Sequence, residues 1–145
     1  MITKERNIKV LSSFYVSEFH LEMIILPYII KEIENENEVI IITENELEKS
    51  IKYLITKLNI DKYQKEDILN LDWNNKELNK IKKIDSNKNK TFFVIGSKKY
   101  INEKNRELKL NNIKIVNCYD LEEVQDEILE IKKNSDMILN IKGEE

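Results

Sequence analysis

The chain has 145 residues, of which 41% are hydrophobic and 35% charged, so it can fold around a core as one domain spanning residues 1–145. Its 24 basic and 27 acidic side chains give a net charge of −3, which excludes the broadly basic surface typical of nucleic-acid binders. Two glycines and one proline exclude collagen-like and glycine-rich linker classes, and they leave no glycine-rich phosphate loop.

Cysteine usage and apolar runs indicate the compartment. The single cysteine, Cys118, cannot form an internal disulfide, and with one histidine the chain has no zinc-ligand spacing. The longest apolar run, residues 23–30, contains Pro27 and is far shorter than the ~20 residues that cross a bilayer. The charged N-terminal segment is not followed by a signal-type apolar run. We therefore expect a soluble, cytoplasmic protein that has no membrane contact and needs no metal or cofactor.

The first part of the chain alternates between strand-like and helix-like patterns. β-Branched and aromatic residues predict a strand over residues 8–16. Apolar positions three and four apart predict a helix over residues 18–34, and Pro27 inside it predicts a kink, because proline lacks the N–H of a helical hydrogen bond. A continuous β-branched run over residues 38–43 predicts a strand that is covered on both faces.

A second helix is predicted directly after that strand. Capping-box spacing places its start at Thr43 or at Asn45, and its apolar positions continue to Leu58. A weaker strand is predicted over residues 68–73 and a short helix over residues 76–84.

The second half continues the alternation. Elements are predicted at residues 91–95 (strand), 99–110 (helix), 113–118 (strand), 121–133 (helix) and 137–141 (strand). The apolar pattern predicts a core that includes Leu26, Ile41, Leu54, Phe93, Ile95, Ile115 and Ile128. Alternating strands and helices without a domain break predict a single three-layer α/β domain, whose mostly parallel sheet of about five strands carries helices on both faces.

One segment has the context of a phosphate site. Gly96-Ser97-Lys98 follows a predicted strand and precedes a helix, and both helix N-terminal amides and lysine attract anions. The phosphate loop proper needs an upstream glycine, but Phe92 stands at that position. A degenerate nucleotide site formed with Asp72 and an ordinary turn are therefore both open interpretations.

No set of residues predicts catalysis or metal binding. His20 has the helical neighbours Glu18 and Glu22, which are not obvious partners for a catalytic triad. Cys118 ends an apolar strand and is followed by Asp120 two residues later, which would not activate a thiol. The sequence therefore predicts no catalytic residue, no metal site and no enzymatic activity.

Polar and aromatic residues lie at the predicted strand ends. In open parallel sheets, ligands bind at the carboxyl ends of the strands. The ligand-binding candidates are accordingly Tyr15, Ser17, Thr43, Asp72, Trp73, Ser97, Tyr119 and Asp120. Thr43, Ser97 and Asp120 could instead cap the helices that follow them, so both interpretations stay open.

Three stretches together suggest a family. They are Phe14-Tyr15-Val16-Ser17 with Leu26-Pro27-Tyr28-Ile29 and residues 38–42; residues 57–61 (Lys-Leu-Asn-Ile-Asp); and residues 113–121, which end in Asn-Cys-Tyr-Asp-Leu, with residues 134–139. In these motifs and in the order of elements, the chain resembles the MEDS (methanogen/methylotroph sensory) domain family, a RecA-like fold without a nucleotide-binding loop. The resemblance implies that the first strand is interior and flanked by the fourth and fifth, which are residues 91–95 and 113–118 among the predicted elements.

The chain departs from the family's pattern at three places. A histidine that is common in the family would fall near Val10, its cysteine at Asn117, and its His-Pro step at Ser135-Asp136. A site built on those residues would be lost or altered here. The resemblance implies a stand-alone sensory or regulatory domain that binds a small molecule or a signalling protein, such as a kinase or a transcription regulator. The alternative is a small nucleotide-binding protein or enzyme with a degenerate site near Gly96-Ser97-Lys98.

Overall fold

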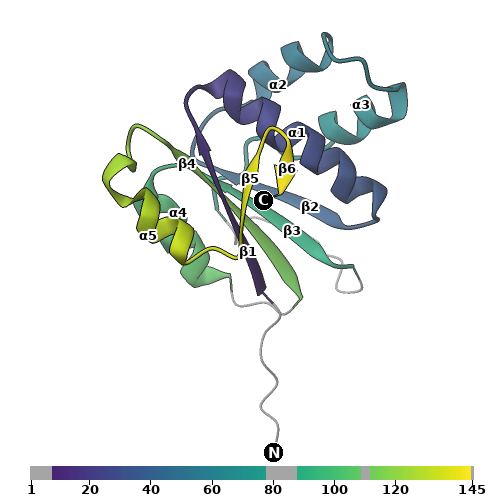
Figure 1. The fold of residues 1–145 in the computed structure, drawn as a ribbon. Helices are drawn as coiled ribbons and strands as arrows, with labels where there is room; N and C mark the ends of the chain where they lie inside the picture. Colours follow the sequence, from purple (N-terminus) through teal and green to yellow (C-terminus); the bar gives the residue numbers. More distant parts are fainter. Residues whose placement is uncertain (1–7, 78–87, 109–111, 145) are drawn as a thin grey trace, which may run out of the picture.

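A sheet with helices on both faces forms the body of the molecule, as Figure 1 shows. The computed structural model describes residues 8–77, 88–108 and 112–144. Its elements are β1 (Ile8–Tyr15), α1 (Glu18–Glu34), β2 (Glu38–Thr43), α2 (Glu48–Ile55), α3 (Lys62–Leu69), β3 (Lys90–Ile95), α4 (Lys98–Glu107), β4 (Ile113–Asp120), a 3₁₀ turn (Gln125–Glu127), α5 (Ile128–Lys133), β5 (Met137–Asn140) and β6 (Gly143–Glu144).

The strand order within the described residues is β2-β3-β4-β1-β5-β6. Strands β1 to β5 are parallel, and the short β6 is antiparallel to β5. The single α/β domain with a mostly parallel sheet is thus confirmed. β1 is interior, but the prediction that residues 91–95 flank it is wrong, since they form β3 on the far side of β4. Residues 68–73 form no strand, so β4 and β5 are the fourth and fifth strands and the neighbours of β1.

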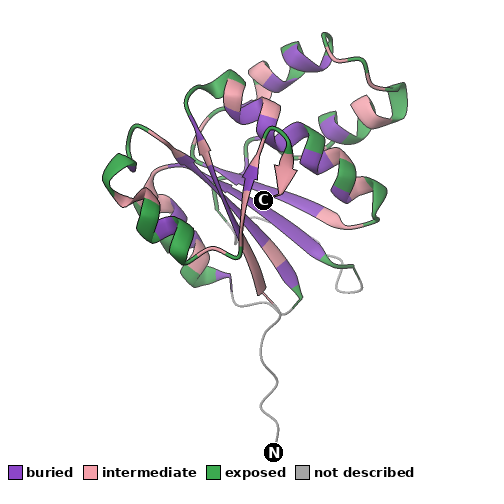
Figure 2. Ribbon diagram, in the orientation of Figure 1, coloured by how far each residue is buried: buried purple, intermediate pink, exposed green. Residues whose placement is uncertain are grey.

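Successive side chains of the central strands enter different layers of the core. Phe93 faces the layer of α1, α2 and α3, whereas Phe92 faces that of α4 and α5. Both phenylalanines are fully buried, and Figure 2 shows the central strands as an almost continuous buried band. A strand that is covered on both faces has to be apolar on both, which explains the continuous apolar runs of β2 and β3.

The predicted core is confirmed apart from one residue. The buried members are Leu26, Ile41, Leu54, Phe93, Ile95 and Ile115. Ile128 is only half-buried. It begins α5, whereas the sequence predicted that this helix would start at residue 121; a turn and the 3₁₀ turn occupy the intervening residues.

The strand predicted over residues 68–73 is wrong. Asp61 caps α3 in a capping box with Gln64, and the helix continues to Leu69. Trp73 is buried beyond a turn, where its indole N–H donates to the Ile68 carbonyl at 2.8 Å. Ile68 near the end of α3 and Trp73 after the turn are both buried, and together they give the sequence an apolar pattern that resembles a strand.

Other predicted boundaries also shift. α2 begins at Glu48 without a side-chain cap, so neither Thr43 nor Asn45 starts it. α1, by contrast, has its predicted bounds, and it runs through Pro27 as one helix. The helix predicted over residues 76–84 lies outside the described residues from 78 onward, as do residues 109 and 110 of the helix predicted after β3.

Replacing Phe93 tests the central position of β3. Its ring is fully buried and meets the Tyr28 ring edge-on, with centroids 6.1 Å apart. Phe93→Ala is expected to lower the free energy of unfolding by about 3–5 kcal/mol in urea titrations, because it removes a packed aromatic ring. Phe93→Leu should cost less than about 1.5 kcal/mol. A loss below about 1 kcal/mol for the alanine variant would mean that β3 is peripheral.

Candidate functional site

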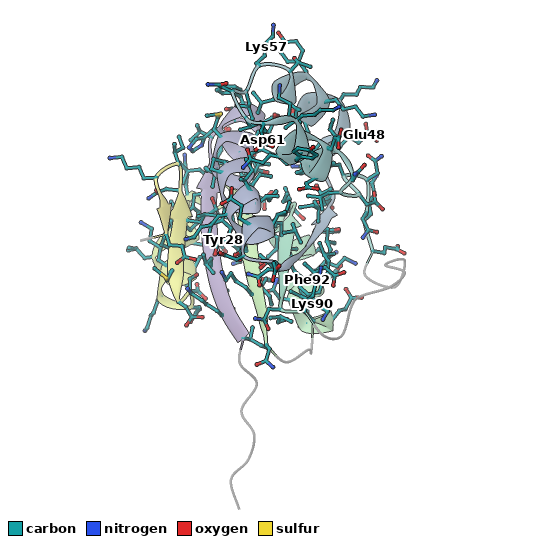
Figure 3. The ribbon with its side chains drawn as sticks, turned by 90° about the vertical axis from the view of Figure 1, so that its right-hand side faces the viewer. Tyr28, Glu48, Lys57, Asp61, Lys90 and Phe92 are labelled. Atoms are coloured by element: carbon teal, nitrogen blue, oxygen red, sulfur yellow. The ribbon has the colours of Figure 1, made fainter. Side chains whose placement is uncertain are left out.

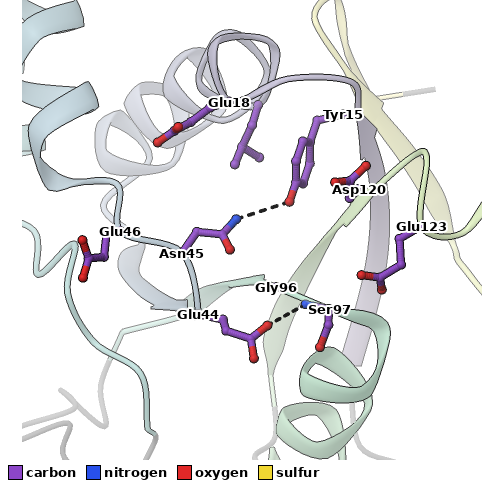
Figure 4. Close-up of a pocket in the computed structure, with 10 residues that line it drawn as sticks. Tyr15, Glu18, Glu44, Asn45, Glu46, Gly96, Ser97, Asp120 and Glu123 are labelled. Atoms are coloured by element: carbon purple, nitrogen blue, oxygen red, sulfur yellow. Dashed lines mark hydrogen bonds between the residues drawn. The ribbon is translucent and has the colours of Figure 1, made fainter.

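A pocket of about 420 Å³ opens at the carboxyl ends of the parallel strands, as Figure 4 shows. Its walls come from the end of β1, the start of α1, the segment after β2, and the turns after β3 and β4. The lining residues are Tyr15, Glu18, Leu21, Glu44, Asn45, Glu46, Gly96, Ser97, Asp120 and Glu123. The pocket therefore lies at the sheet edge where the sequence predicted a ligand site.

Three of the predicted candidates line this pocket: Tyr15, Ser97 and Asp120. Two others lie next to it without lining it. Ser17 caps α1 by accepting a hydrogen bond from the His20 amide. Thr43 is fully buried, and its hydroxyl both accepts from the amide and donates to the carbonyl of Asn45, which holds this pocket residue in place.

The remaining candidates lie elsewhere. Asp72 accepts a hydrogen bond from the Asn74 amide, and Trp73 is buried in the core layer of α1, α2 and α3. Tyr119 belongs to the opposite core layer, where its ring stacks on Phe14. Consecutive residues of a strand point to opposite faces, so Tyr119 and Asp120 cannot both reach one pocket.

Sequence reasoning missed most of the acidic lining: Glu18, Glu44, Glu46 and Glu123, together with Asn45. The signal was present, because Glu-Asn-Glu follows β2 and two glutamates follow Asp120. The candidates predicted from the sequence stop at the strand ends, whereas the pocket is also lined by residues of the segments that follow β2 and β4.

Tyr15 and Asn45 form a hydrogen-bonded pair in the pocket wall. The Asn45 side-chain amide donates to the Tyr15 hydroxyl at 3.3 Å, and Figure 4 shows this bond. Burial raises the pKa of Tyr15 above its ordinary value of 10, so the phenol stays neutral at physiological pH. Its own proton has no acceptor among the described residues, which leaves a donor for a ligand.

The N-terminus of α4 is bonded to the chain's own carboxylates. The Ser97 amide donates to Glu44 Oε1 at 2.9 Å, as Figure 4 shows. The Lys98 amide donates to Glu123 Oε1 at 2.7 Å. The Lys98 ammonium pairs with Glu127 at 2.6 Å. Helix N-terminal amides and a nearby lysine are the groups that bind phosphate in nucleotide sites. Here these groups already hold carboxylates.

Gly96 permits this arrangement through its lack of a side chain. A Cβ atom at this position would lie 2.9 Å from Glu44 Cβ and 2.7 Å from a ring carbon of Tyr100. Any larger residue would therefore push the Glu44 side chain away from the α4 amides. The close approach of the Glu44 side chain therefore explains the glycine at position 96 without a bound phosphate.

The pocket has a strongly negative lining. Five carboxylates line it, and among the described residues no basic side chain does. Glu18 accepts a hydrogen bond from Ser50 at 2.8 Å, and Asp120 accepts one from the Glu122 amide at 3.0 Å. No three His, Cys, Asp or Glu side chains of the described residues are placed to hold a metal ion. The carboxylates of this pocket do not converge on one point, as the ligands of a metal ion would. Such an arrangement favours an organic cation whose positive charges are separated.

Histidine and cysteine have structural positions near this edge. His20 Nδ1 accepts a hydrogen bond from the Val16 amide at 3.0 Å, which closes the turn between β1 and α1. Cys118 is fully buried, and this burial raises the pKa of its thiol far above the ordinary value. Neither residue lines the pocket.

Comparisons with known proteins give no independent information about this site. No family model, curated protein or solved structure matches the chain. Within the described ranges, none of the helices combines the length and apolar character that a bilayer crossing needs.

Glu22 provides a pH test at the start of α1. Its side chain is one turn from Glu18 and the residue is only 4% exposed. Burial, reinforced by the charge of Glu18, raises the pKa of Glu22 from 4.5 to about 7. The unfolded chain therefore ionises before the folded one, and stability falls as pH rises between these two values.

Glu22→Gln should remove this loss. Relative to the wild type, the free energy of unfolding of the variant is expected to be roughly 1–2 kcal/mol higher at pH 8 than at pH 5, as measured by urea unfolding. Glu66→Gln, on the exposed side of α3, is the matched control and should not change the pH dependence. A Glu22→Gln variant with the pH profile of the wild type would contradict this account of Glu22.

Proposed function

We propose that the chain is a cytoplasmic sensory or regulatory domain of the MEDS type, which binds a small organic cation at the carboxyl edge of its sheet and does not catalyse a reaction. One observation carries this proposal: the pocket is lined by five carboxylates, and two of them, Glu44 and Glu123, already accept the first amides of α4. The electrostatic field of such a pocket attracts ammonium groups and repels phosphates.

The size and shape of the lining favour a ligand with more than one ammonium group. A pocket of about 420 Å³ accommodates a small organic molecule. Glu18 and Glu46 lie on different walls of the pocket from Asp120, so their negative charges are separated around its rim. Tyr15 and Leu21 supply apolar surface for the methylene groups between the ammonium groups of such a ligand.

The degenerate nucleotide site is the second candidate. Its support is the position of Gly96-Ser97-Lys98 between β3 and α4. A phosphate there would have to displace Glu44 and Glu123 from the amides and separate the Lys98 ammonium from Glu127. Each displacement exposes a carboxylate to the incoming anion, so the organic cation is the better supported ligand.

The pocket adjoins a surface that suits a protein partner. Val16, in the turn between β1 and α1, is 67% exposed, and Phe19, in the first turn of α1, is 62% exposed. Tyr15 directly precedes Val16, Glu18 directly precedes Phe19, and both Tyr15 and Glu18 line the pocket. A bound ligand can therefore alter the turn after β1 and the start of α1, which carry this apolar surface, and this is a direct route to a signalling kinase or transcription regulator.

Thermal unfolding of the purified chain with spermidine or with Mg-ATP tests the proposal. Spermidine is expected to raise the melting temperature saturably, because it binds only the folded state, and Mg-ATP is expected to leave it unchanged. High salt should weaken the spermidine effect, since the attraction is electrostatic.

Glu18→Gln/Glu46→Gln removes two pocket charges that do not bond to α4 and should weaken spermidine binding roughly five- to tenfold. Glu66→Gln/Glu103→Gln is the control, because it removes two exposed carboxylates outside the pocket. Stabilisation by Mg-ATP without any by spermidine would contradict the proposal and favour the nucleotide site.

A further inference from the structure

A second hollow, of about 500 Å³, is lined by residues of α1 and of the hairpin of β5 and β6. It shares no lining residue with the carboxyl-edge pocket. Ile141 and Lys142 form the turn of this hairpin, and Gly143 follows as the first residue of β6 with φ +107°, a conformation that glycine adopts readily. The hairpin brings β6 against α1. The hollow is therefore a separate feature at another part of the sheet.

The walls of the hollow expose apolar surface to water. Pro27 on α1 is exposed, and Ile141 in the hairpin is 53% exposed. Met137 and Leu139 of β5 line the same hollow. Apolar side chains that remain open to solvent in a concave place are typical of a binding site for an apolar molecule.

Two lysines of the lining have no carboxylate partner. Lys31 and Lys142 are exposed, and neither forms an ion pair with a described residue. Glu144 also lines the hollow, but its carboxylate already accepts a hydrogen bond from the Tyr28 hydroxyl and pairs with Lys9 at 3.4 Å. The hollow thus offers two unneutralised positive charges beside apolar walls.

The interactions of Glu144 belong to a fixed network. Tyr28, which is labelled in Figure 3, accepts a hydrogen bond from Lys114 at 2.7 Å, and Lys114 pairs with the buried Glu32 at 2.7 Å. Burial tends to raise the pKa of Glu144, but the hydrogen bond from Tyr28 and the charges of Lys9 and Lys114 outweigh it and lower the pKa. Glu144 is therefore an ionised residue engaged with these partners, and it does not neutralise Lys31 or Lys142.

From this geometry we propose that the hollow between α1 and the β5–β6 hairpin binds a small amphipathic carboxylate. Its aliphatic body lies against Pro27, Met137 and Ile141, and its carboxylate lies between Lys31 and Lys142. The ligand has the opposite charge to the one proposed for the carboxyl-edge pocket. The two proposals can therefore fail independently.

Methionine methyl groups report on this site directly. Met137 lines the hollow, whereas Met23 on α1 does not and serves as an internal reference. In spectra of protein labelled with ¹³C at the methionine methyl groups, octanoate should shift the Met137 signal saturably, with a dissociation constant of about 1 mM for a ligand of this size. Met23 should move much less.

Charge variants separate the proposed contact from simple apolar adsorption. Lys31→Gln/Lys142→Gln is expected to weaken octanoate binding roughly five- to tenfold, because both substitutions remove the only unpaired charges of the hollow among the described residues. Lys132→Gln/Lys133→Gln removes two exposed charges of α5 and should leave octanoate binding unchanged. Octylammonium and octan-1-ol should bind more weakly than octanoate.

Three results would overturn the proposal. The first is a Met137 signal that octanoate does not shift. The second is equal binding of octanoate and octylammonium, which would show that the lysines do not select an anion. The third is a Lys31→Gln/Lys142→Gln variant that binds octanoate as well as the wild type does.

Discussion

The hydrogen bonds between the first amides of α4 and the carboxylates of Glu44 and Glu123 determine the chemistry of the carboxyl edge. They depend on the parallel sheet, which brings the ends of β2, β3 and β4 to one place, and on Gly96, which leaves room for Glu44. Carboxylates at a helix N-terminus are stabilised by its partial positive charge. The carboxylates of Glu44 and Glu123 thereby occupy the helix N-terminus that could otherwise bind an anion. The pocket beside it keeps an acidic lining.

α1 connects the two candidate sites. Its first turns provide Glu18 to the acidic pocket, and its later turns provide Pro27 and Lys31 to the apolar hollow. Between the later turns and the sheet lies the ion pair of Glu32 and Lys114. Glu32 is only 2% exposed, and it is satisfied by further hydrogen bonds from the Thr91 hydroxyl and the Asn37 amide. Breaking such a buried pair is costly, so this network fixes α1 on the sheet.

The alternation of strands and helices could be predicted from the sequence, because β-branched runs and helical periodicity are local signals. The sequence also placed Tyr15, Ser97 and Asp120 at one edge, since parallel strands end together. It failed where burial is not local: Trp73 is buried beyond a helix end, and its segment therefore resembled a strand. The sequence shows that glutamates follow β2 and β4, but not that Glu44 and Glu123 bond to the α4 amides, because that depends on how the chain turns after these strands.

The most direct measurement of the central claim follows the Ser97 and Lys98 amides by NMR during a titration with inorganic phosphate. In the wild type these amides already donate to Glu44 and Glu123, so the account predicts that phosphate leaves their signals in place. In Glu44→Ala/Glu123→Ala the amides are released, and both signals should move saturably, because a free helix N-terminus binds anions. A saturable shift of both amides in the wild type would contradict the account and would mean that this edge is a phosphate site.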